Sequence, residues 1–387
     1  MNYIIEIIII SLITGIILFV VYRKKDIVNE KKNFYDALER VSSLIDQDNQ
    51  KDIYDSLQIC NNILNKITSE KDPFLFGLVK FKIGTAHLKL SQASNKKDNL
   101  GKAIDAFYKA VWVYNKKEFP LEYASITNNI GNAYKALFEI EDSEENISKA
   151  IEAYEEVIDI KTAEYHPDDY AATINNLGNA YRILAVVSET EGNLGKAIAA
   201  YETALKIRTI DKNPFDYAIT QNNLGTAYKM LADISEPEVN LIKAIDAYEE
   251  ALMIFTPEGS PLKYAAINNN LGSAYSNLSI EKGLECYEEA LKIYTIDNAP
   301  IEYAMVQNNI GNSYRTIISD ETEDNMILAI SAYEEALKVF TEDNHPIYHN
   351  ISLRNLEASR EKVSSHQKIN LALRIHLLKR ILDKKTG

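Results

Sequence analysis

The stretch Asn175–Leu184, NNLGNAYRIL, decides the fold, because close copies of it recur along the chain. The copies are NNIGNAYKAL from Asn128, NNLGTAYKML from Asn222, NNLGSAYSNL from Asn269 and NNIGNSYRTI from Asn308. The interval between glycines is 47 residues from Gly131 to Gly178, Gly225 and Gly272, and 39 to Gly311, while a weaker copy, KIGTAHLKL, surrounds Gly84. A repeat period of about 20–50 residues is typical of solenoids, in which each unit packs only on its neighbours.

The composition limits the partners that the surface can attract. The 387 residues carry 42 basic and 56 acidic side chains, a net charge of −14. This charge argues against nucleic acid or anionic lipid as the partner of the whole surface. The two cysteines, Cys60 and Cys286, are far apart and lack ligand spacing, so we expect neither a disulfide framework nor a zinc site. We interpret both as small core residues.

Residues 1–25 are interpreted as an N-terminal transmembrane anchor with its basic flank. Tyr3–Tyr22 has 20 residues and one charge, and a helix of this length reaches about 30 Å, the thickness of a bilayer core. Arg23, Lys24 and Lys25 follow directly, which places the rest of the chain on the cytoplasmic side. A cleaved signal peptide is the alternative, but a basic n-region and a cleavage site are missing. The sequence thus predicts a single-pass protein of the cell membrane.

The remaining chain is divided into a degenerate first helix pair (26–71), a repeat array (72–364) and a C-terminal capping helix (365–387). A proline precedes each repeat glycine, or its equivalent, by 11 residues: Pro73, Pro120, Pro167, Pro214, Pro261, Pro300 and Pro346. Because proline is tolerated in the first turn of a helix and not in its interior, each of them marks a helix start. A polar break and a second helix, such as KAIEAYEEVIDI from Lys149, follow each motif. In the 39-residue interval the missing residues fall in this break, which predicts a shorter hairpin.

The spacing of apolar residues predicts which helix faces are buried. In the first helix they stand at −5, −1, +2, +3 and +6 from the glycine, within one arc of about 100°; in one repeat they are Ile126, Ile130, Ala133, Tyr134 and Leu137. In the second helix, small residues flank a tyrosine, as at Ala150, Tyr154 and Val157. We expect the small residues to let the helices approach closely and the tyrosine to fill the space between them. The acidic pairs that follow, such as Glu249 and Glu250, are interpreted as a solvated outer face.

The glycine, alanine and tyrosine of the first helix, followed by Ala, Tyr and Ala in the second, resemble the tetratricopeptide repeat (TPR) family. The resemblance covers about Asp72–Val363 and, more weakly, Ile27–Glu70. The family's usual unit has about 34 residues, so the 47-residue unit is similar to the extended variants of kinesin light chains and of bacterial protease-linked TPR proteins. The resemblance implies an all-α solenoid of antiparallel helix pairs in a right-handed superhelix, here preceded by one transmembrane helix. It also implies binding of a protein or peptide in the concave groove that the first helices line.

A row of polar side chains on the first helices is the candidate ligand-binding groove. Positions −3, +1 and +4 lie opposite the apolar stripe, and we name the following fourteen residues the binding row: Asn128, Asn132, Lys135, Asn175, Asn179, Arg182, Asn222, Thr226, Lys229, Asn269, Ser273, Asn308, Asn312 and Arg315. Asparagine amides can bond both the N–H and the C=O of an extended peptide, and lysine or arginine can bond its carboxylates. The second asparagine of each pair, such as Asn129, is interpreted as structural, bonding a neighbouring backbone group.

Other classes of function are less well supported by the residues. The six histidines are scattered, and neither a phosphate-binding glycine loop nor a nucleophile motif is present, so we expect no enzyme, cofactor or metal ion. An RNA-binding helical repeat is one alternative, although near-identical repeats would require a homopolymer and the net charge opposes it. A purely architectural role in assembly at the membrane is another. The sequence favours a membrane-anchored interaction scaffold that binds an acidic or extended segment of a protein partner.

Overall fold

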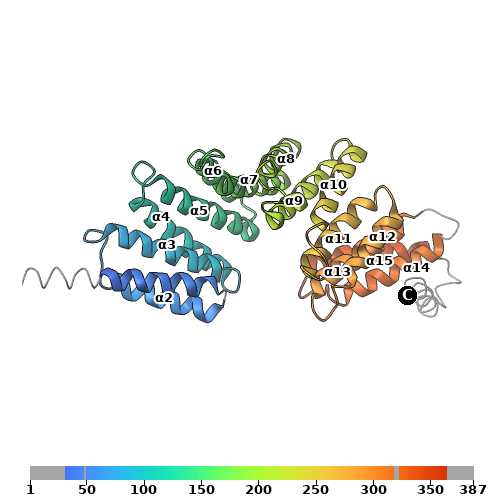
Figure 1. Ribbon diagram of the computed structural model, residues 1–387. Coiled ribbons are helices and arrows are strands. Elements are labelled where there is room, and N and C mark those ends of the chain that lie inside the picture. The colour runs from blue at the N-terminus through green and yellow to red at the C-terminus, as the bar shows by residue number, and fades with distance from the viewer. Residues whose placement is uncertain (1–30, 48, 318–321, 364–387) are drawn as a thin grey trace, which may run out of the picture. The chain divides into compact units, whose positions relative to one another are not determined.

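The computed structural model describes residues 31–47, 49–317 and 322–363, and every regular element within these ranges is an α-helix (Figure 1). A helix over residues 31–46 comes first. It is followed by α2 (Gln50–Leu64), α3 (Pro73–Leu90), α4 (Lys96–Val113), α5 (Pro120–Glu141), α6 (Glu144–Ile158), α7 (Pro167–Val187), α8 (Thr190–Leu205), α9 (Pro214–Ala232), α10 (Pro237–Leu252), α11 (Pro261–Tyr275), α12 (Ile280–Leu291), α13 (Pro300–Thr316), α14 (Thr322–Leu337) and α15 (Pro346–Lys362). The chain divides into an N-terminal unit that ends at Ala180 and a C-terminal unit that begins at Tyr181.

Each predicted proline starts a helix. The seven prolines are the first residues of the odd-numbered helices from α3 to α15, which we call the A helices, and the even-numbered helices from α4 to α14 are the B helices. The first N–H groups of a helix have no carbonyl partner within it, so proline loses no hydrogen bond at this position. The predicted alternation of paired helices is therefore confirmed.

The helices pack as a stack of pairs. In the N-terminal unit α3 packs on α4, α4 on α5 and α5 on α6, and in the C-terminal unit the same order runs from α8 to α15. Successive A helices also touch, α3 with α5 in the first unit and α9, α11, α13 and α15 in the second. Each helix thus contacts its near neighbours in the sequence, which is the packing of a solenoid.

The repeat glycines allow the tyrosine of the B helix to lie directly on the A helix. A Cβ atom at Gly131 would stand 2.7 Å from Cε1 of Tyr154, and one at Gly225 would stand 2.8 Å from Cε1 of Tyr248. Both tyrosines are fully buried. The same contact joins Gly272 to Tyr287 and Gly311 to Tyr333, and Gly84 to a phenylalanine, Phe107. Since no side chain fits between the glycine and the ring, glycine is required for this helix spacing.

A buried asparagine closes the turn between the two helices of a pair. Nδ2 of Asn193 donates to the carbonyl oxygen of Ser188 at 2.7 Å, and Nδ2 of Asn240 donates to that of Ser235 at the same distance. Asn99 bonds Ser94 in the same way at 2.8 Å. The burial of these asparagines and their hydrogen bonds make them part of the hairpin.

The short repeat is shortened in its helices and not in its turn. Helix α11 has 15 residues against 19 in α9, and α12 has 12 against 16 in α10. The turns 233–236 and 276–279 have equal length. The expected short hairpin is therefore present, but each of its helices is about one turn shorter, which preserves the turn geometry.

The acidic pairs bond tyrosines of two A helices. In α10, Glu250 accepts a hydrogen bond from the hydroxyl of Tyr217 in α9 at 2.7 Å, and Glu249 accepts one from Tyr275 in α11 at 2.7 Å. The bonds from Tyr123 to Glu156, at 2.8 Å, and from Tyr264 to Glu289, at 3.0 Å, repeat the first of these contacts. Burial and the neighbouring Glu156 raise the pKa of Tyr123 to about 12. The pairs therefore stabilise the stacking, in addition to solvating the outer surface.

The predicted architecture needs one correction. Within the described ranges, no helix combines the length and the apolar character that a membrane span requires. The longest, α5, has 22 residues but carries Glu122, Lys135, Glu139 and Glu141, because one face of each repeat helix is polar. The interval Tyr3–Tyr22 lies outside the described residues, as does the capping segment 365–387. The all-α solenoid is confirmed, whereas the membrane span and the cell-membrane localisation have no support in the structure and are not retained.

We expect a glycine-to-alanine substitution to lower the free energy of unfolding at Gly131 and to raise it at Gly101. Gly131→Ala places a methyl group against the Tyr154 ring, and overpacking of this kind costs about 1–3 kcal/mol. Gly101→Ala, in the exposed face of α4, meets no atom within 4 Å and is expected to stabilise the helix by about 0.5–1 kcal/mol. Urea denaturation followed by circular dichroism measures both free energies of unfolding. Equal changes at the two positions would contradict the role assigned to the repeat glycines.

Candidate functional site

The binding row occupies the A helices α5, α7, α9, α11 and α13. All fourteen side chains are half-buried except Asn175, which is 6% exposed. The row therefore borders the packed interior of each unit and does not project freely into solvent. Its three positions have different neighbours, and each position is described in turn.

Position +1 accepts the hydroxyl hydrogen of the buried tyrosine. The hydroxyl of Tyr154 donates to Oδ1 of Asn132 at 2.7 Å, and that of Tyr248 donates to Oγ1 of Thr226 at 3.2 Å. Asn312 accepts from Tyr333 at 2.8 Å, and Ser273 is a hydrogen-bond partner of Tyr287. Burial raises the pKa of Tyr248 to about 12, so this hydroxyl stays protonated at neutral pH and can donate. Asparagine, threonine and serine all supply the oxygen that a buried hydroxyl needs.

Position −3 forms links between successive A helices of the C-terminal unit. Oδ1 of Asn269 in α11 accepts from Nδ2 of Asn309 in α13 at 2.9 Å, and Oδ1 of Asn222 is 3.4 Å from Nδ2 of Asn270. Asn308 accepts from the hydroxyl of Ser352 in α15 at 3.1 Å. The second asparagine of a pair thus bonds the first asparagine of the preceding repeat.

The second asparagine of a pair bonds a backbone group in one repeat and a side chain in two others. In the N-terminal unit, Nδ2 of Asn129 donates to the backbone oxygen of Ser125 at 2.9 Å, as the sequence analysis expected. In the C-terminal unit, Asn270 and Asn309 bond side chains and not backbone groups. These amides are structural in both cases, but their partners differ between the two units.

Position +4 carries half-buried cations. Arg182 hydrogen-bonds the hydroxyl of Tyr201, and Arg315 that of Tyr333. The Nε atoms of both arginines are buried and have no hydrogen-bond partner among the described residues. Lys135 and Lys229 occupy the same position in their repeats and are also half-buried. A cation that is partly removed from water attracts a carboxylate more strongly than an exposed cation does.

Two predicted residues lie together in a pocket at the C-terminal ends of α3 and α5. Asn132 and Lys135 line a cavity of about 500 Å³ together with Leu88, Lys96 and Glu139. Nζ of Lys96 lies 2.6 Å from Oε2 of Glu139, so one lysine and the glutamate form an ion pair. The charged lining consists of two lysines and one glutamate and favours an anionic group.

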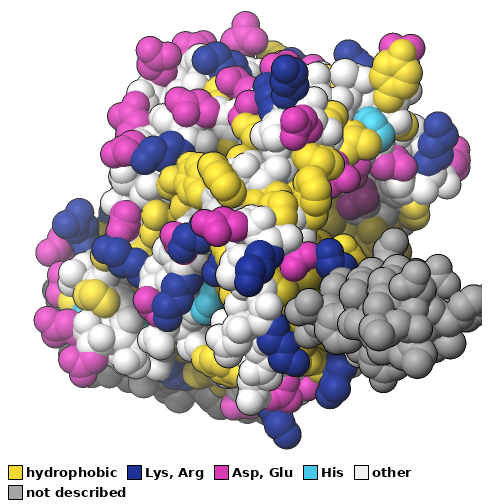
Figure 2. Space-filling model, turned by 90° about the vertical axis from the view of Figure 1, so that its left-hand side faces the viewer, with side chains coloured by type: hydrophobic (Ala, Val, Ile, Leu, Met, Phe, Trp, Pro, Cys, Tyr) yellow, Lys and Arg dark blue, Asp and Glu magenta, His cyan; other side chains and the backbone are white. Residues whose placement is uncertain are grey.

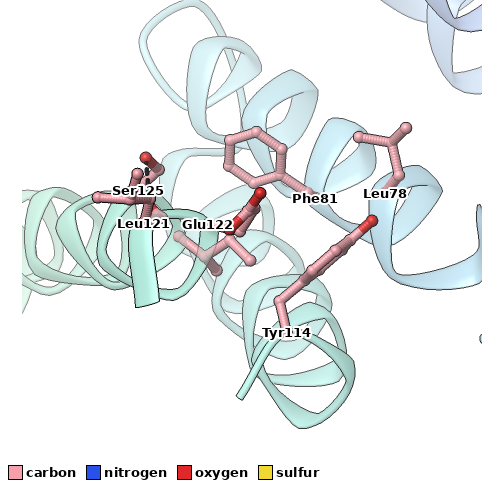
Figure 3. Close-up of a pocket in the computed structure, with 7 residues that line it drawn as sticks. Leu78, Phe81, Tyr114, Leu121, Glu122 and Ser125 are labelled. Carbon is pink, nitrogen blue, oxygen red and sulfur yellow. Dashed lines mark hydrogen bonds between the residues drawn. The ribbon is translucent and has the colours of Figure 1, made fainter. Parts of the chain in front are cut away.

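Sequence reasoning missed an apolar pocket at the opposite end of the same two helices. Leu78 and Phe81 of α3 face Leu121 and Ser125 of α5, and the Tyr114 ring lies below Leu78 and Phe81 in the view of Figure 3. The cavity has a volume of about 330 Å³. Its signal in the sequence is the register: Phe81 stands three residues before Gly84, where the later repeats have the first asparagine of the pair.

The acidity of the protein is not concentrated in one patch on the surface that Figure 2 shows. On this face acidic and basic side chains are interspersed, and hydrophobic side chains form a band between them. The net charge of −14 therefore does not prevent a local site for an anionic partner.

The histidines are the residues most often used in catalysis, and their positions in this structure are as follows. Nδ1 of His87 is 2.9 Å from Oδ1 of Asn99, and burial lowers the pKa of this histidine. His345 and His349 lie at the start of α15. Within the described ranges, no group of three or more His, Cys, Asp or Glu residues is placed to hold a metal ion.

The bond at position +1 predicts a measurable coupling. Asn132→Leu leaves the buried Tyr154 hydroxyl without an acceptor, which costs about 1–3 kcal/mol. Adding Tyr154→Phe removes the stranded hydroxyl, so the double variant is expected to be more stable than Asn132→Leu alone. A double-mutant cycle in urea measures the coupling energy, expected at about 0.5–3 kcal/mol. Additive losses in the two single variants would show that the bond contributes nothing to stability.

The cysteines predict slow alkylation of the native protein. Burial raises the pKa of Cys60 to about 12 and that of Cys286 to about 11, and the thiolate is the reactive form. At pH 8, iodoacetamide is expected to modify both residues at least about a hundredfold more slowly in the native protein than in urea. The rate at Cys286 should rise about tenfold for each pH unit up to 10, as the thiolate fraction grows. Mass spectrometry of the labelled peptides provides the rates, and fast labelling of native Cys60 would exclude its place in the core.

Comparison with known proteins places the fold. No family model and no curated protein sequence matches the chain. Among solved structures, the apo form of the quorum sensor NprR from B. thuringiensis is similar with a TM-score of 0.53 and 16% identity, over 84% of this chain and 87% of that chain. A chain of the APC/C hetero-tetramer Cut9-Hcn1 is similar with a TM-score of 0.52 and 17% identity, over 82% of this chain. The match spans only 48%, about half, of the latter chain's length. At these identities the likeness concerns the fold.

Proposed function

We propose that this chain, which has the fold of the tetratricopeptide repeat family, is a protein-interaction module. Within each unit, the A helices bind an extended or acidic segment of a partner protein. The proposal rests on the chemistry of the A helices themselves, because similarity of fold alone does not define a function.

The observation that carries the proposal is the recurrence of half-buried cations along the A helices of an acidic protein. Lys135 provides the cation in the N-terminal unit, and Arg182, Lys229 and Arg315 provide it in the C-terminal unit. A cation in this position has lost part of its hydration. The charge-assisted hydrogen bonds of a carboxylate can replace the lost bonds to water. Simple solubility does not explain why these cations are set against the packed interior, since exposed lysines provide it without desolvation.

The asparagines offer a second set of contacts. The carboxamide of Asn269 uses its oxygen for Asn309, and its Nδ2 group has two N–H donors that can bond the carbonyl groups of an extended segment. Neutral hydrogen bonds contribute about 1 kcal/mol each, so five of them give about 5 kcal/mol. Micromolar affinity needs about 8 kcal/mol. The amides therefore align a segment, and charge pairs or apolar contacts must provide the remaining affinity.

Charge reversal on the A helices tests the proposal. A displayed library of random peptides is selected on the full chain, and the dissociation constants of enriched peptides are measured by fluorescence anisotropy. In the variant with Lys135→Glu, Arg182→Glu and Lys229→Glu, we expect binding to weaken at least tenfold, because three cations become like charges for an acidic segment. Thermal melting verifies that the variant is folded, since Arg182 also bonds Tyr201.

The matched control reverses three exposed lysines outside the binding row, Lys117→Glu, Lys206→Glu and Lys212→Glu. It changes the net charge by the same amount, so general electrostatic repulsion affects both variants equally. Affinity within twofold of the original chain is expected for the control. The proposal fails when the two triple variants bind equally well, or when the library yields no peptide for the original chain.

A further inference from the structure

We propose that the groove between α3 and α5 is selective for an extended partner segment that carries a bulky apolar side chain and, about five residues away, a carboxylate. This inference rests on the proposed function and specifies the ligand for one part of the N-terminal unit. The apolar side chain enters the pocket at the N-terminal ends of the two helices. The carboxylate binds at their C-terminal ends.

The apolar pocket has the size and the lining of an anchor site. Its cavity of about 330 Å³ is bordered by Leu78, Phe81, Tyr114 and Leu121, and the volume lies at the lower end of the range for small-molecule sites. Figure 3 shows the side chains of α3 and α5 on opposite sides of the cavity, with the Tyr114 ring below Leu78 and Phe81. Leu121 is 44% exposed, so its apolar surface is still available for burial by a ligand.

The pocket wall is fixed by contacts inside the protein. The hydroxyl of Tyr114 donates to the backbone oxygen of Phe74 at 2.8 Å. The Tyr114 ring stands edge-on to Phe119, with centroids 5.6 Å apart and an interplanar angle of 88°. Phe81 contacts Phe107, the buried residue under Gly84, with centroids 6.1 Å apart. A wall held in this way needs little ordering when a ligand binds, which favours affinity.

Within the N-terminal unit, the apolar residues that α3 contributes to the pocket are specific to this repeat. Leu78 and Phe81 stand six and three residues before Gly84, and the next repeat has Ser125 and Asn128 at these positions. The other asparagine motifs also have an asparagine three residues before the glycine. A bulky apolar side chain therefore finds its counterpart at one place along the A helices of the N-terminal unit.

The distance between the two ends of the groove sets the spacing in the ligand. Ser125 borders the apolar pocket and Lys135 borders the polar one, and ten residues of helix α5 span about 15 Å. An extended chain covers this distance in about five residues at 3.3 Å each. Between the pockets lies Asn128, whose buried Oδ1 atom has no hydrogen-bond partner among the described residues.

The charges at the two ends determine which end receives the carboxylate. The exposed Glu122 is one of the residues that line the apolar pocket. Beside the pocket lies the pair of Lys161 with Asp169, whose Nζ and Oδ2 atoms are 2.9 Å apart. Lys161 also donates to Ser125 at 3.2 Å, which places it at this end of the groove. The charges of Glu122, Lys161 and Asp169 sum to −1. The polar pocket, with Lys96, Lys135 and Glu139, sums to +1. A carboxylate is repelled next to the anchor and attracted at the far end.

The test uses the full chain and a displayed library of random ten-residue peptides. We expect the enriched peptides to share a bulky apolar residue with an aspartate or glutamate four to six positions away. Leu121→Asp places a carboxylate at the rim of the apolar pocket and is expected to raise the dissociation constants of these peptides at least tenfold. The matched control is Leu262→Asp, because Leu262 also follows a helix-starting proline and is 60% exposed. It should change the constants less than twofold.

A second variant distinguishes loss of the apolar pocket from loss of the fold. Leu78→Ser with Phe81→Asn introduces the residues of the next repeat, and a repeated selection on it should lose the apolar residue and keep the acidic one. Enriched peptides without an apolar residue, or unchanged affinity in Leu121→Asp, would overturn the inference and leave the proposed function intact. No enrichment at all would overturn both. Self-association of the chain that Leu121→Asp abolishes, with peptide binding unaffected, would assign the pocket to a second copy and also overturn the inference.

Discussion

The structure depends on one contact, the packing of an aromatic ring of a B helix against a glycine of the A helix, with a tyrosine in four pairs and Phe107 in another. With no side chain at Gly225, the ring of Tyr248 approaches the backbone of α9 within van der Waals distance, and this sets the spacing between the A and B helices. The hydroxyl then reaches the oxygen of Thr226, one residue beyond the glycine. A larger residue at the glycine would separate the helices and would leave the hydroxyl buried without an acceptor, which is costly in a low-dielectric interior.

The same contact explains why much of the binding row repeats so closely. Position +1 must offer an acceptor to the tyrosine, and in the C-terminal unit the asparagines at −3 and −2 bond one another between successive A helices. These contacts recur in several repeats and hold the stack together whether or not a ligand binds. Although Arg182 and Arg315 also bond buried tyrosine hydroxyls, the residues at +4 and in the first regular repeat vary more. Selectivity for a partner must therefore come from them.

Periodicity within the sequence was sufficient to predict the helix starts, the buried stripe and the tyrosine that fills the space between the two helices of a pair. Ile126, Ile130, Ala133 and Tyr134 are buried as predicted, whereas Leu137 is half-buried and the next residue, Phe138, is buried instead. Contacts between repeats were not predictable in this way. Glu249 was interpreted as a solvated residue, yet it bonds Tyr275 of the following repeat, and no pattern within a single repeat reports such a bond. The apolar pocket departs from the repeat, because Leu78 and Phe81 stand where the next repeat has Ser125 and Asn128, and the shared pattern does not report them.

A departure from the repeat can fix the register in which an extended segment binds. On an array of identical repeats, an extended segment can shift by one unit with no change in energy, so its register is not defined. Phe81 and Leu78 remove this degeneracy in the N-terminal unit, because burying a leucine-sized side chain is worth about 1.5–3 kcal/mol at their pocket and little at a position lined by asparagine and serine. A difference of 2 kcal/mol corresponds to about a thirtyfold preference for one register. The amides and cations of the regular repeats can then be similar to one another without loss of specificity, since a single irregular repeat fixes the position of the segment and the regular positions add affinity to it.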